Sequence, residues 1–593
     1  MRFTLASFFL LILIQFSAAQ VEERISEVLE GFSGISENEL EALIETIEDS
    51  LNTHSCLEDT LFLVDPFKFP VKISVISTYW RNFEESIGFS QEILDGGFTG
   101  KQYGLRNRCL VSGINFRIKS ISESDPGESN GFNMDHRSLG IEIRPSRERF
   151  RIFFGDYNIL AGMGLGISTR PVFNSWKGEP ITMTKKRTII ETHGGANENS
   201  FFRGGAAEIY LQKFKAIVFC SGIDRDGIIK TSVDGEDYFH GLYSSGLHRT
   251  NSELLRKDVV YEELGGIVVE FAAHRFEIGT VFTSFNFSEN LMLPQSNKLF
   301  VGDPDYKNSA RRVSSYTRGL IANGMFTGEI SISGNQRSAL LLSYTKFERK
   351  GLSYMISLSN YNAGFFSHDT SVSPSLFTNR TSNEGRINVL FRPGRKWGTQ
   401  ADIRIDGINN AAFDKDASSV KFRSFFFYDL DLLRIENHFQ FQQGNIRYSF
   451  RIRAKDIDKP FYWQGEIGVS SKHFQSLIRV PGSYISMRGR YVLDKPRINI
   501  QGGVSLFTSS SGNPAFYTYE PDVLYGMSLP ALSGTGSRVF MLFNYNFLKS
   551  FSLQLKLAKV DYDDRDEIGS GNDRIPTNHR TSIKVQLVYR SQN

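Results

Sequence analysis

The sequence predicts an all-β fold: a large transmembrane antiparallel β-barrel of about 22–26 strands, with a short N-terminal helical segment and an internal plug-like loop. Three observations lead to this prediction. From about residue 68 onward, segments of roughly ten residues alternate apolar and polar side chains. No apolar run after residue 20 approaches the ~18 residues of a membrane-spanning helix. Aromatic residues make up 13% of the chain, which is typical of barrels whose Tyr and Phe side chains ring the membrane interfaces.

The composition excludes several other classes of protein. The 593 residues include 68 Lys and Arg against 65 Asp and Glu, a formal net charge of +3, so the whole-chain charge does not indicate a nucleic-acid partner. The three cysteines, Cys56, Cys109 and Cys220, lack the spacing of a disulfide scaffold or a metal site. No Pro- or Ser-rich linker and no block of like charges divides the chain. We therefore expect a single barrel domain over residues 67–593.

The first residues have the pattern of a secretory signal. Arg2 precedes an apolar run over residues 8–14, and the small residues 17–19 provide a cleavage site. The alternative is an uncleaved membrane anchor, but the apolar run is shorter than the ~20 residues that a span needs. We expect residues 1–19 to be a signal peptide and the mature protein to leave the cytoplasm.

Each strand-like segment has one apolar and one polar face, because successive side chains of a strand point to opposite sides. A soluble β-sandwich would also alternate in this way. However, roughly two dozen such segments follow one another without linkers, among them residues 102–118 and 148–158. A closed barrel leaves no sheet edge, as lipid requires. A barrel of this width needs water or a plug in its lumen.

Two regions interrupt the alternation. Residues 160–202 contain Gly162, Gly164, Gly166 and Trp176 but no sustained period, and they end next to Arg203. Irregular insertions of this length inside a strand array tend to be functional, so we expect residues 160–202 to fold inward as the plug. The second region, residues 225–257, contains Thr250 and Glu253 at the spacing of a helix capping box.

Several strings of residues carry a resemblance to a known family. In chain order they are Gly155–Tyr157 with Gly162–Leu165, Asn197–Gly204, Gly246–Glu253, Tyr517–Tyr525, Gly534–Arg538 and Asp564–Gly571. As an ordered set over about residues 70–590, they resemble the large Bacteroidota-type outer-membrane barrels known as helix-hairpin-helix or ComEA-like DNA-uptake-related proteins. The resemblance implies an outer-membrane barrel in a Gram-negative envelope, and a role in DNA uptake.

The sequence departs from that family at both ends. The candidate helix-hairpin-helix is Phe32–Ser36, where Ser36 replaces the second glycine. Residues 21–50 hold ten acidic residues and one basic residue, Arg24, which is the wrong sign for contacts with phosphate. We interpret residues 20–66 as a periplasmic amphipathic helical segment that docks periplasmic or lipoprotein partners, with DNA unlikely there. At the other end, Tyr589 is followed by Arg590–Asn593 without a final aromatic residue, which leaves the register of the closing strand open.

The chain has no motif of an enzyme or of a cofactor site. Gly162, Gly164 and Gly166 lack the context of a nucleotide-binding loop, and no nucleophile elbow is present. The loop histidines His193, His240 and His248 come from different loops, so we predict no metal site from them. The acidic residues Asp561, Asp563, Asp564 and Asp566 are a weak Ca²⁺ candidate that lacks EF-hand spacing, and a solvated surface loop is the favoured interpretation.

The polar faces of the middle strands carry several arginines. These candidate lumen-lining residues are Arg447, Arg451, Arg453, Arg488 and Arg490. Clustered lumen arginines favour anionic solutes. The alternative is that they form ion pairs with plug residues or with wall acids such as Asp402, Asp406, Asp456 and Glu466.

Together these patterns predict a non-enzymatic outer-membrane barrel, embedded in outer-membrane lipid, that acts in transport or translocation and uses no cofactor. The alternative is a closed scaffold that docks partners in an envelope assembly or export complex. Nothing in these residues identifies the substrate.

Overall fold

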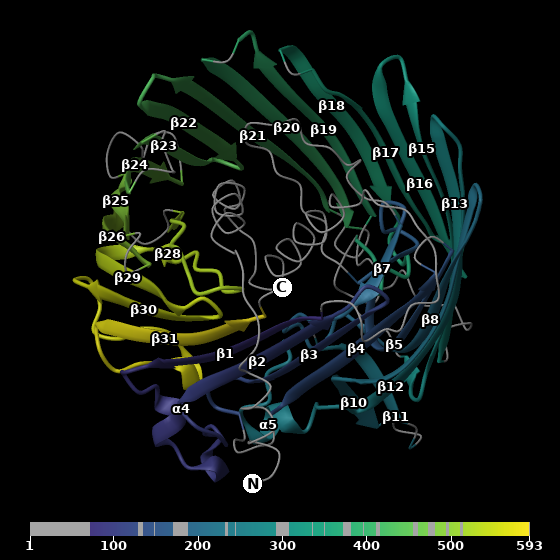
Figure 1. The fold of residues 1–593 in the computed structure, drawn as a ribbon, viewed down its shortest axis with the longest axis horizontal. Coiled ribbons are helices and arrows are strands. Elements are labelled where there is room, and N and C mark those ends of the chain that lie inside the picture. The colour runs from purple at the N-terminus through teal and green to yellow at the C-terminus, as the bar shows by residue number, and fades with distance from the viewer. Residues whose placement is uncertain are drawn as a thin grey trace.

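The chain forms a closed antiparallel barrel of 24 strands, seen end-on as a ring in Figure 1. This confirms the predicted fold class and strand number. The computed structural model describes residues 71–591 except 129–133, 147–148, 170–187, 232–234, 236, 244, 292–307, 335, 349, 372–380, 395, 411–414, 455–459, 473–480, 494–496 and 510–513. The predicted signal peptide and the helical segment 20–66 therefore lie outside the described residues.

The barrel strands follow one another in sequence order around the ring. They are β1 Lys72–Asn82, β2 Tyr103–Ser112, β3 Phe116–Ser124, β4 His136–Ser146, β5 Phe150–Ala161, β8 Phe202–Leu211, β9 Phe214–Arg225, β12 Val260–Ala272, β13 Phe276–Phe287, β15 Ser309–Ile321, β16 Gly324–Ser333, β17 Ser338–Lys346, β18 Gly351–Tyr361, β19 Thr381–Arg392, β20 Trp397–Asn410, β21 Lys415–Asp429, β22 Leu433–Gln442, β23 Asn445–Ala454, β24 Phe461–Ser471, β25 Gly482–Leu493, β26 Ile498–Ser509, β29 Gly534–Leu548, β30 Phe551–Tyr562 and β31 His579–Arg590.

Shorter elements lie in the loops. They are β6 Ile167–Ser168, β7 Ile189–Thr192, β10 Gly227–Thr231, β11 Asp237–Leu242, β14 Asn290–Leu291, β27 Phe516–Tyr517, β28 Ala531–Leu532, α4 Ile87–Ser90, α5 Asn251–Leu254 and the 3₁₀ turns η3 Ile93–Asp95 and η5 Gly571–Asp573. The capping box predicted at Thr250 and Glu253 is present at the start of α5. No helix among the described residues is long and apolar enough to cross a membrane.

The first and last strands close the ring. β1 pairs with β31 from Ser74 opposite Arg590 to Asn82 opposite Ser582, and β30 pairs with β31 along its other edge. The missing final aromatic therefore does not disturb the register, and Tyr589 is fully buried with its ring 4.9 Å from that of Phe551.

The alternation of side chains matches a barrel in lipid. Aliphatic residues face outward and stay exposed, as Leu358 (57%) and Leu506 (53%) do. The side chains that alternate with the aliphatic ones along each strand point inward, and Glu329 and Arg312, for example, are buried on the inner face. The predicted single segment 102–118 was wrong, because the turn at residues 113–115 divides it into β2 and β3. In this turn the apolar Ile114 lies between Gly113 and Asn115, which continues the alternation and hides the break.

Aromatic rings gather near the short turns at one end of the strands. The sets of neighbouring rings include Phe214, Phe271 and Phe276, then Phe391, Trp397 and Phe426, and finally Tyr545, Phe547 and Phe551. They form one of the aromatic girdles expected at a membrane interface.

The two ends of the barrel differ. The start of β1 and the end of β31 lie at the end with short turns, such as residues 212–213, 322–323 and 549–550. The opposite end carries the long loops. Outer-membrane barrels have short turns on the periplasmic side and long loops outside, so we assign the long-loop end to the cell exterior.

Candidate functional site: loops that pack inside the barrel

Three loops from the long-loop end turn inward and pack against the inner wall. Their described parts are residues 162–169 with 188–201, residues 362–371, and residues 514–533. The strands β7 and β28, which belong to the first and third loops, lie on the inner side of the ring in Figure 1. The inner wall and these loops are the candidate site.

The first inward loop begins with a glycine turn that touches the wall. Gly162 and Gly164 have φ of +57° and +87°, conformations that favour glycine because it has no Cβ. At Gly166, a Cβ would come within 2.9 Å of side-chain atoms of Ser314 and Val281. Glycine is therefore needed both to make the turn and to bring the backbone onto the wall.

The side chain of Glu329 on β16 binds the backbone of this turn. Its carboxylate accepts backbone hydrogen bonds from Met163 (2.5 Å) and Gly166 (2.8 Å), and the Ser314 hydroxyl donates to it at 2.6 Å. A carboxylate that accepts several N–H and O–H donors makes strong, charge-assisted bonds. Glu329 thus fixes the turn to the wall.

Arg312 on β15 joins the first inward loop to the second. Its guanidinium is fully buried and donates to the carbonyl of Gly166 at 2.8 Å. It also donates to the carbonyls of Phe366 (3.0 Å) and His368 (2.9 Å). One side chain therefore holds the backbones of two loops on the inner face.

The second inward loop ends in a buried ion-pair group. His368 approaches Glu262 of β12 at 2.6 Å, and Glu262 also pairs with Arg225 of β9 at 3.0 Å. Asp369 lies 3.3 Å from His368 and 3.8 Å from Arg225. The loop leaves the barrel at β18, so these contacts extend it along the inner wall as far as β9.

The third inward loop is held by acids on the loop and bases on the wall. Glu520 pairs with Arg538 through both carboxylate oxygens, at 2.5 and 2.9 Å. Asp522 pairs with Lys584 at 2.7 Å and with Lys556 at 3.7 Å. Burial opposes the charge of the Asp522 carboxyl, but the two lysines outweigh it and hold its pKa below the ordinary value.

The predicted lumen arginines lie on the inner face, where most contact acids or loop aromatics. Arg451 pairs with Glu466 at 2.8 Å and with Glu436 at 3.6 Å; Arg453 pairs with Glu436 at 3.3 Å. Arg447 lies over the ring of Tyr517, and Arg488 over that of Tyr519. Arg490 is half-buried on the same face of β25 as Arg488. These contacts match the alternative prediction, in which the arginines form ion pairs, better than the prediction of an uncompensated positive surface in the lumen.

The other predicted site residues are spread over the molecule. Arg203 pairs with Asp156 at 2.8 Å, where β5 and β8 meet. Trp176 and Asp456 lie outside the described residues. Of the acids weighed as arginine partners, Asp402 contacts Arg386 and Arg423 instead, and Asp406 contacts Arg404.

The weak Ca²⁺ candidate lies at the end of β30 and in the outer loop that follows it. Asp561 pairs with Lys559 at 2.7 Å, and Asp564 pairs with Arg565 at 3.0 Å. Asp563 and Asp566 lie in the same loop, and Asp563 is exposed.

The sequence analysis missed the second and third inward loops. A usable signal was present for the third one, because residues 508–533 separate two clear strands and are too long for a hairpin turn. A pocket of about 260 Å³ remains between residues 523–526 of this loop and the inner faces of β1, β2 and β31. The packing is therefore close but not complete.

The closed ring, the lipid-facing aliphatic residues and the aromatic girdle define a membrane-spanning barrel of the outer-membrane type. The protein belongs in the outer membrane.

No protein-family model matches the chain, and no curated protein matches it. Among solved structures, the chain is similar to the P pilus usher PapC translocation pore, with 8% identity over 88% of this chain and 99% of that one and a TM-score of 0.36. It is similar to the FrpB iron transporter from Neisseria meningitidis, with 10% identity, 89% and 83% coverage and a TM-score of 0.39. The siderophore receptor PirA from Pseudomonas aeruginosa gives 7% identity, 89% and 81% coverage and a TM-score of 0.40. Likenesses this distant carry no argument about function.

Proposed function

We propose that the protein transports or translocates a solute or polymer across the outer membrane, without covalent chemistry, through a path that its own loops close. One observation carries the proposal: three loops from the outer end are bound to the inner wall by buried charged side chains. A 24-stranded barrel is too wide to be filled by its strand side chains. Loops held inside it by polar contacts are suited to a closure that opens.

The contacts indicate how such a closure opens. Glu329, Arg312 and Glu520 hold the loops through hydrogen bonds and ion pairs, whose partners can be exchanged for water or for polar groups of a ligand. The loops also pack apolar side chains such as Leu165, Phe366 and Leu532 against the wall, so the ligand must also offset the exposure of these side chains. A ligand that binds the released loops better than the attached ones shifts the population toward the open path.

Single-channel conductance of the refolded protein in a planar bilayer tests the proposal. We expect low conductance from the full chain and a severalfold higher conductance after residues 162–201 are replaced by a short Gly-Ser turn. The matched control shortens only the tip of an outer loop, residues 569–574, which contacts loop 83–102 and Arg249. If all three proteins form folded barrels in the bilayer and none conducts, the proposal fails.

A second candidate function, a scaffold for partner proteins, rests on an exposed apolar pair. Leu94 is 91% exposed and Leu255 is 80% exposed. Their loops lie side by side, because the Asn251 side chain donates to the Ile93 carbonyl at 3.3 Å; α4 and α5 are neighbours in Figure 1. If this patch docks a partner, a Leu94→Ser/Leu255→Ser variant will lose a co-purifying protein that the full chain retains.

The roles inferred for the ends of the chain remain proposals. Docking of periplasmic or lipoprotein partners by residues 20–66 concerns a segment outside the described residues, whereas the DNA uptake implied by the family resemblance concerns the barrel. Deleting residues 20–66 while keeping the signal peptide tests the docking by co-purification, and uptake of labelled DNA by cells with and without the protein tests the second role.

A further inference from the structure

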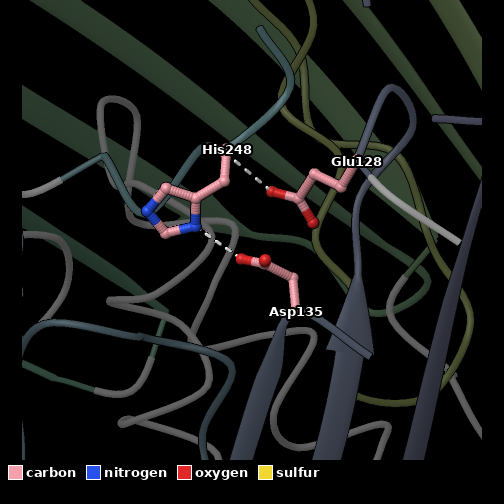
Figure 2. A group of neighbouring side chains, drawn as sticks. All are labelled: Glu128, Asp135 and His248. Atoms are coloured by element: carbon pink, nitrogen blue, oxygen red, sulfur yellow. Dashed lines mark hydrogen bonds and ion pairs between the residues drawn. The ribbon is translucent and has the colours of Figure 1, made fainter. Parts of the chain in front are cut away.

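Three side chains from two loops converge at the outer rim of the barrel. Glu128 and Asp135 come from the loop between β3 and β4, and His248 comes from the loop between β11 and α5. Figure 2 shows the three side chains pointing toward one another. Asp226, at the end of β9, approaches His248 from the other side.

The three side chains have the composition and spacing of a metal site. One ligating atom from each of Glu128, Asp135 and His248 lies within 4.8 Å of the other two. The Asp135 carboxylate is 2.5 Å from His248 Nδ1, and a Glu128 oxygen accepts the backbone N–H of His248 at 3.2 Å. An imidazole nitrogen and two carboxylates are ligands that Zn²⁺ takes in proteins.

The second ring nitrogen of His248 is already oriented. Its Nε2 is 2.9 Å from the Asp226 carboxylate, and the other oxygen of Asp226 accepts the backbone N–H of Asp258 at 3.1 Å. Metal-binding histidines commonly donate their free N–H to a carboxylate in this way, which fixes the ring and the tautomer. An acidic cluster alone would not contain this arrangement.

The charges around the group favour a bound cation. Lys257 pairs with Asp135 at 2.5 Å, but further acids surround the site. Three carboxylates, those of Glu128, Asp135 and Asp226, surround His248, and Lys257 pairs with one of them.

We propose that Glu128, Asp135 and His248 bind one divalent transition-metal ion of the Zn²⁺ class, with Asp226 as the residue that positions His248. The mixture of one nitrogen and two oxygen donors suits Zn²⁺ better than Ca²⁺, which takes six to eight oxygens. The ion links the loop 125–135 to the loop 246–258 on the outer face. The three ligands are different residues from Glu329, Arg312 and Glu520, which carry the transport proposal, so the two proposals can be tested separately.

Zn²⁺ titration of the chelator-treated, folded barrel in detergent, against a chromophoric competitor, tests the site. We expect one Zn²⁺ per chain and at least a 100-fold loss of affinity in His248→Gln and in Asp135→Asn. The control is His579→Gln, since His579 lies at the same end of the barrel, 3.6 Å from Glu84, and should bind Zn²⁺ as the full chain does. The heat-modifiable gel shift of a folded barrel shows which variants have folded.

Asp226→Asn separates a positioning role from a structural one. It keeps all three ligands, so we expect the stoichiometry to stay at one while affinity falls about 10- to 100-fold. The Co²⁺-loaded protein should show ligand-field bands that His248→Gln abolishes. No stoichiometric binding by the folded full chain, or equal binding by folded His248→Gln, overturns the proposal and leaves an ion-pair cluster around a protonated His248.

Discussion

At the scale of single residues, one side chain, that of Arg312, connects the inner wall to two of the inward loops. It is a fully buried arginine whose guanidinium donates to three backbone carbonyls, one on the first inward loop and two on the second. Removing it leaves these carbonyls without that donor, and each such loss costs about 1–3 kcal/mol.

Arg312→Leu should therefore loosen both loops together. We expect their attachment to weaken by about 2–4 kcal/mol, since removal of a buried charge offsets part of the loss. Hydrogen exchange measured by mass spectrometry should rise at residues 162–169 and 363–369, and channel openings should become more frequent. The matched control is Arg311→Leu: Arg311 is the neighbouring arginine on the same strand, exposed on the opposite face. Faster exchange in only one of the two loops would contradict the shared connection.

At the scale of elements, the third inward loop is attached by charge and should respond to acid. Asp522, outside the membrane-spanning strands, faces Lys556 and Lys584, and Glu520 faces Arg538 beside it. The pKa of Asp522 is lowered from its ordinary value of 3.8. Because the pKa of Asp522 is lower in the attached loop than in the released one, its ion pairs stabilise the attachment fully above pH 3.8. This stabilisation is lost as the pH falls through the lowered pKa of Asp522.

We expect proteolysis or hydrogen exchange of residues 514–533 to increase as the pH falls below about 4. Asp522→Asn should weaken the loop at neutral pH and remove part of the acid response. The Glu520–Arg538 pair remains in this variant and should keep part of the loop attached. Identical pH curves for the full chain and Asp522→Asn would show that Asp522 does not hold the loop.

The same elements show what the sequence can predict. Alternation with period two is local, so it predicted the strands and the shared face of Arg447 and Arg451. The partners of Arg451 follow from register: Glu436 and Glu466 lie directly opposite it on the neighbouring strands, and the turn positions could have indicated them. Contacts such as Gly166 with Glu329, 163 residues apart in sequence, depend on where a loop lands inside the closed ring. No local pattern encodes that position.

The convergence at the outer rim was hidden for a similar reason. The sequence predicts no metal site at His248 because His193, His240 and His248 come from different loops, whereas the neighbours of His248 in space are carboxylates. Asp135 is 113 positions away and Asp226 is 22 positions away. Barrel closure determines which long loops are neighbours. These neighbours can be predicted from the sequence only when every strand has been identified correctly.

At the scale of the whole molecule, stability in lipid depends on the single seam between β1 and β31. Nine residue pairs join these strands, from Ser74 with Arg590 to Asn82 with Ser582. Without β31, both β1 and β30 become open edges, and each backbone group without a partner in lipid costs several kcal/mol. Truncation after residue 578 should therefore prevent assembly of the folded barrel, although 23 of the 24 strands remain. The control truncation removes only residues 592–593, beyond the last strand, and should fold normally. The readouts are heat-modifiable migration on a gel and protease resistance in lipid vesicles; a protease-resistant barrel from the longer truncation would show that the seam is dispensable.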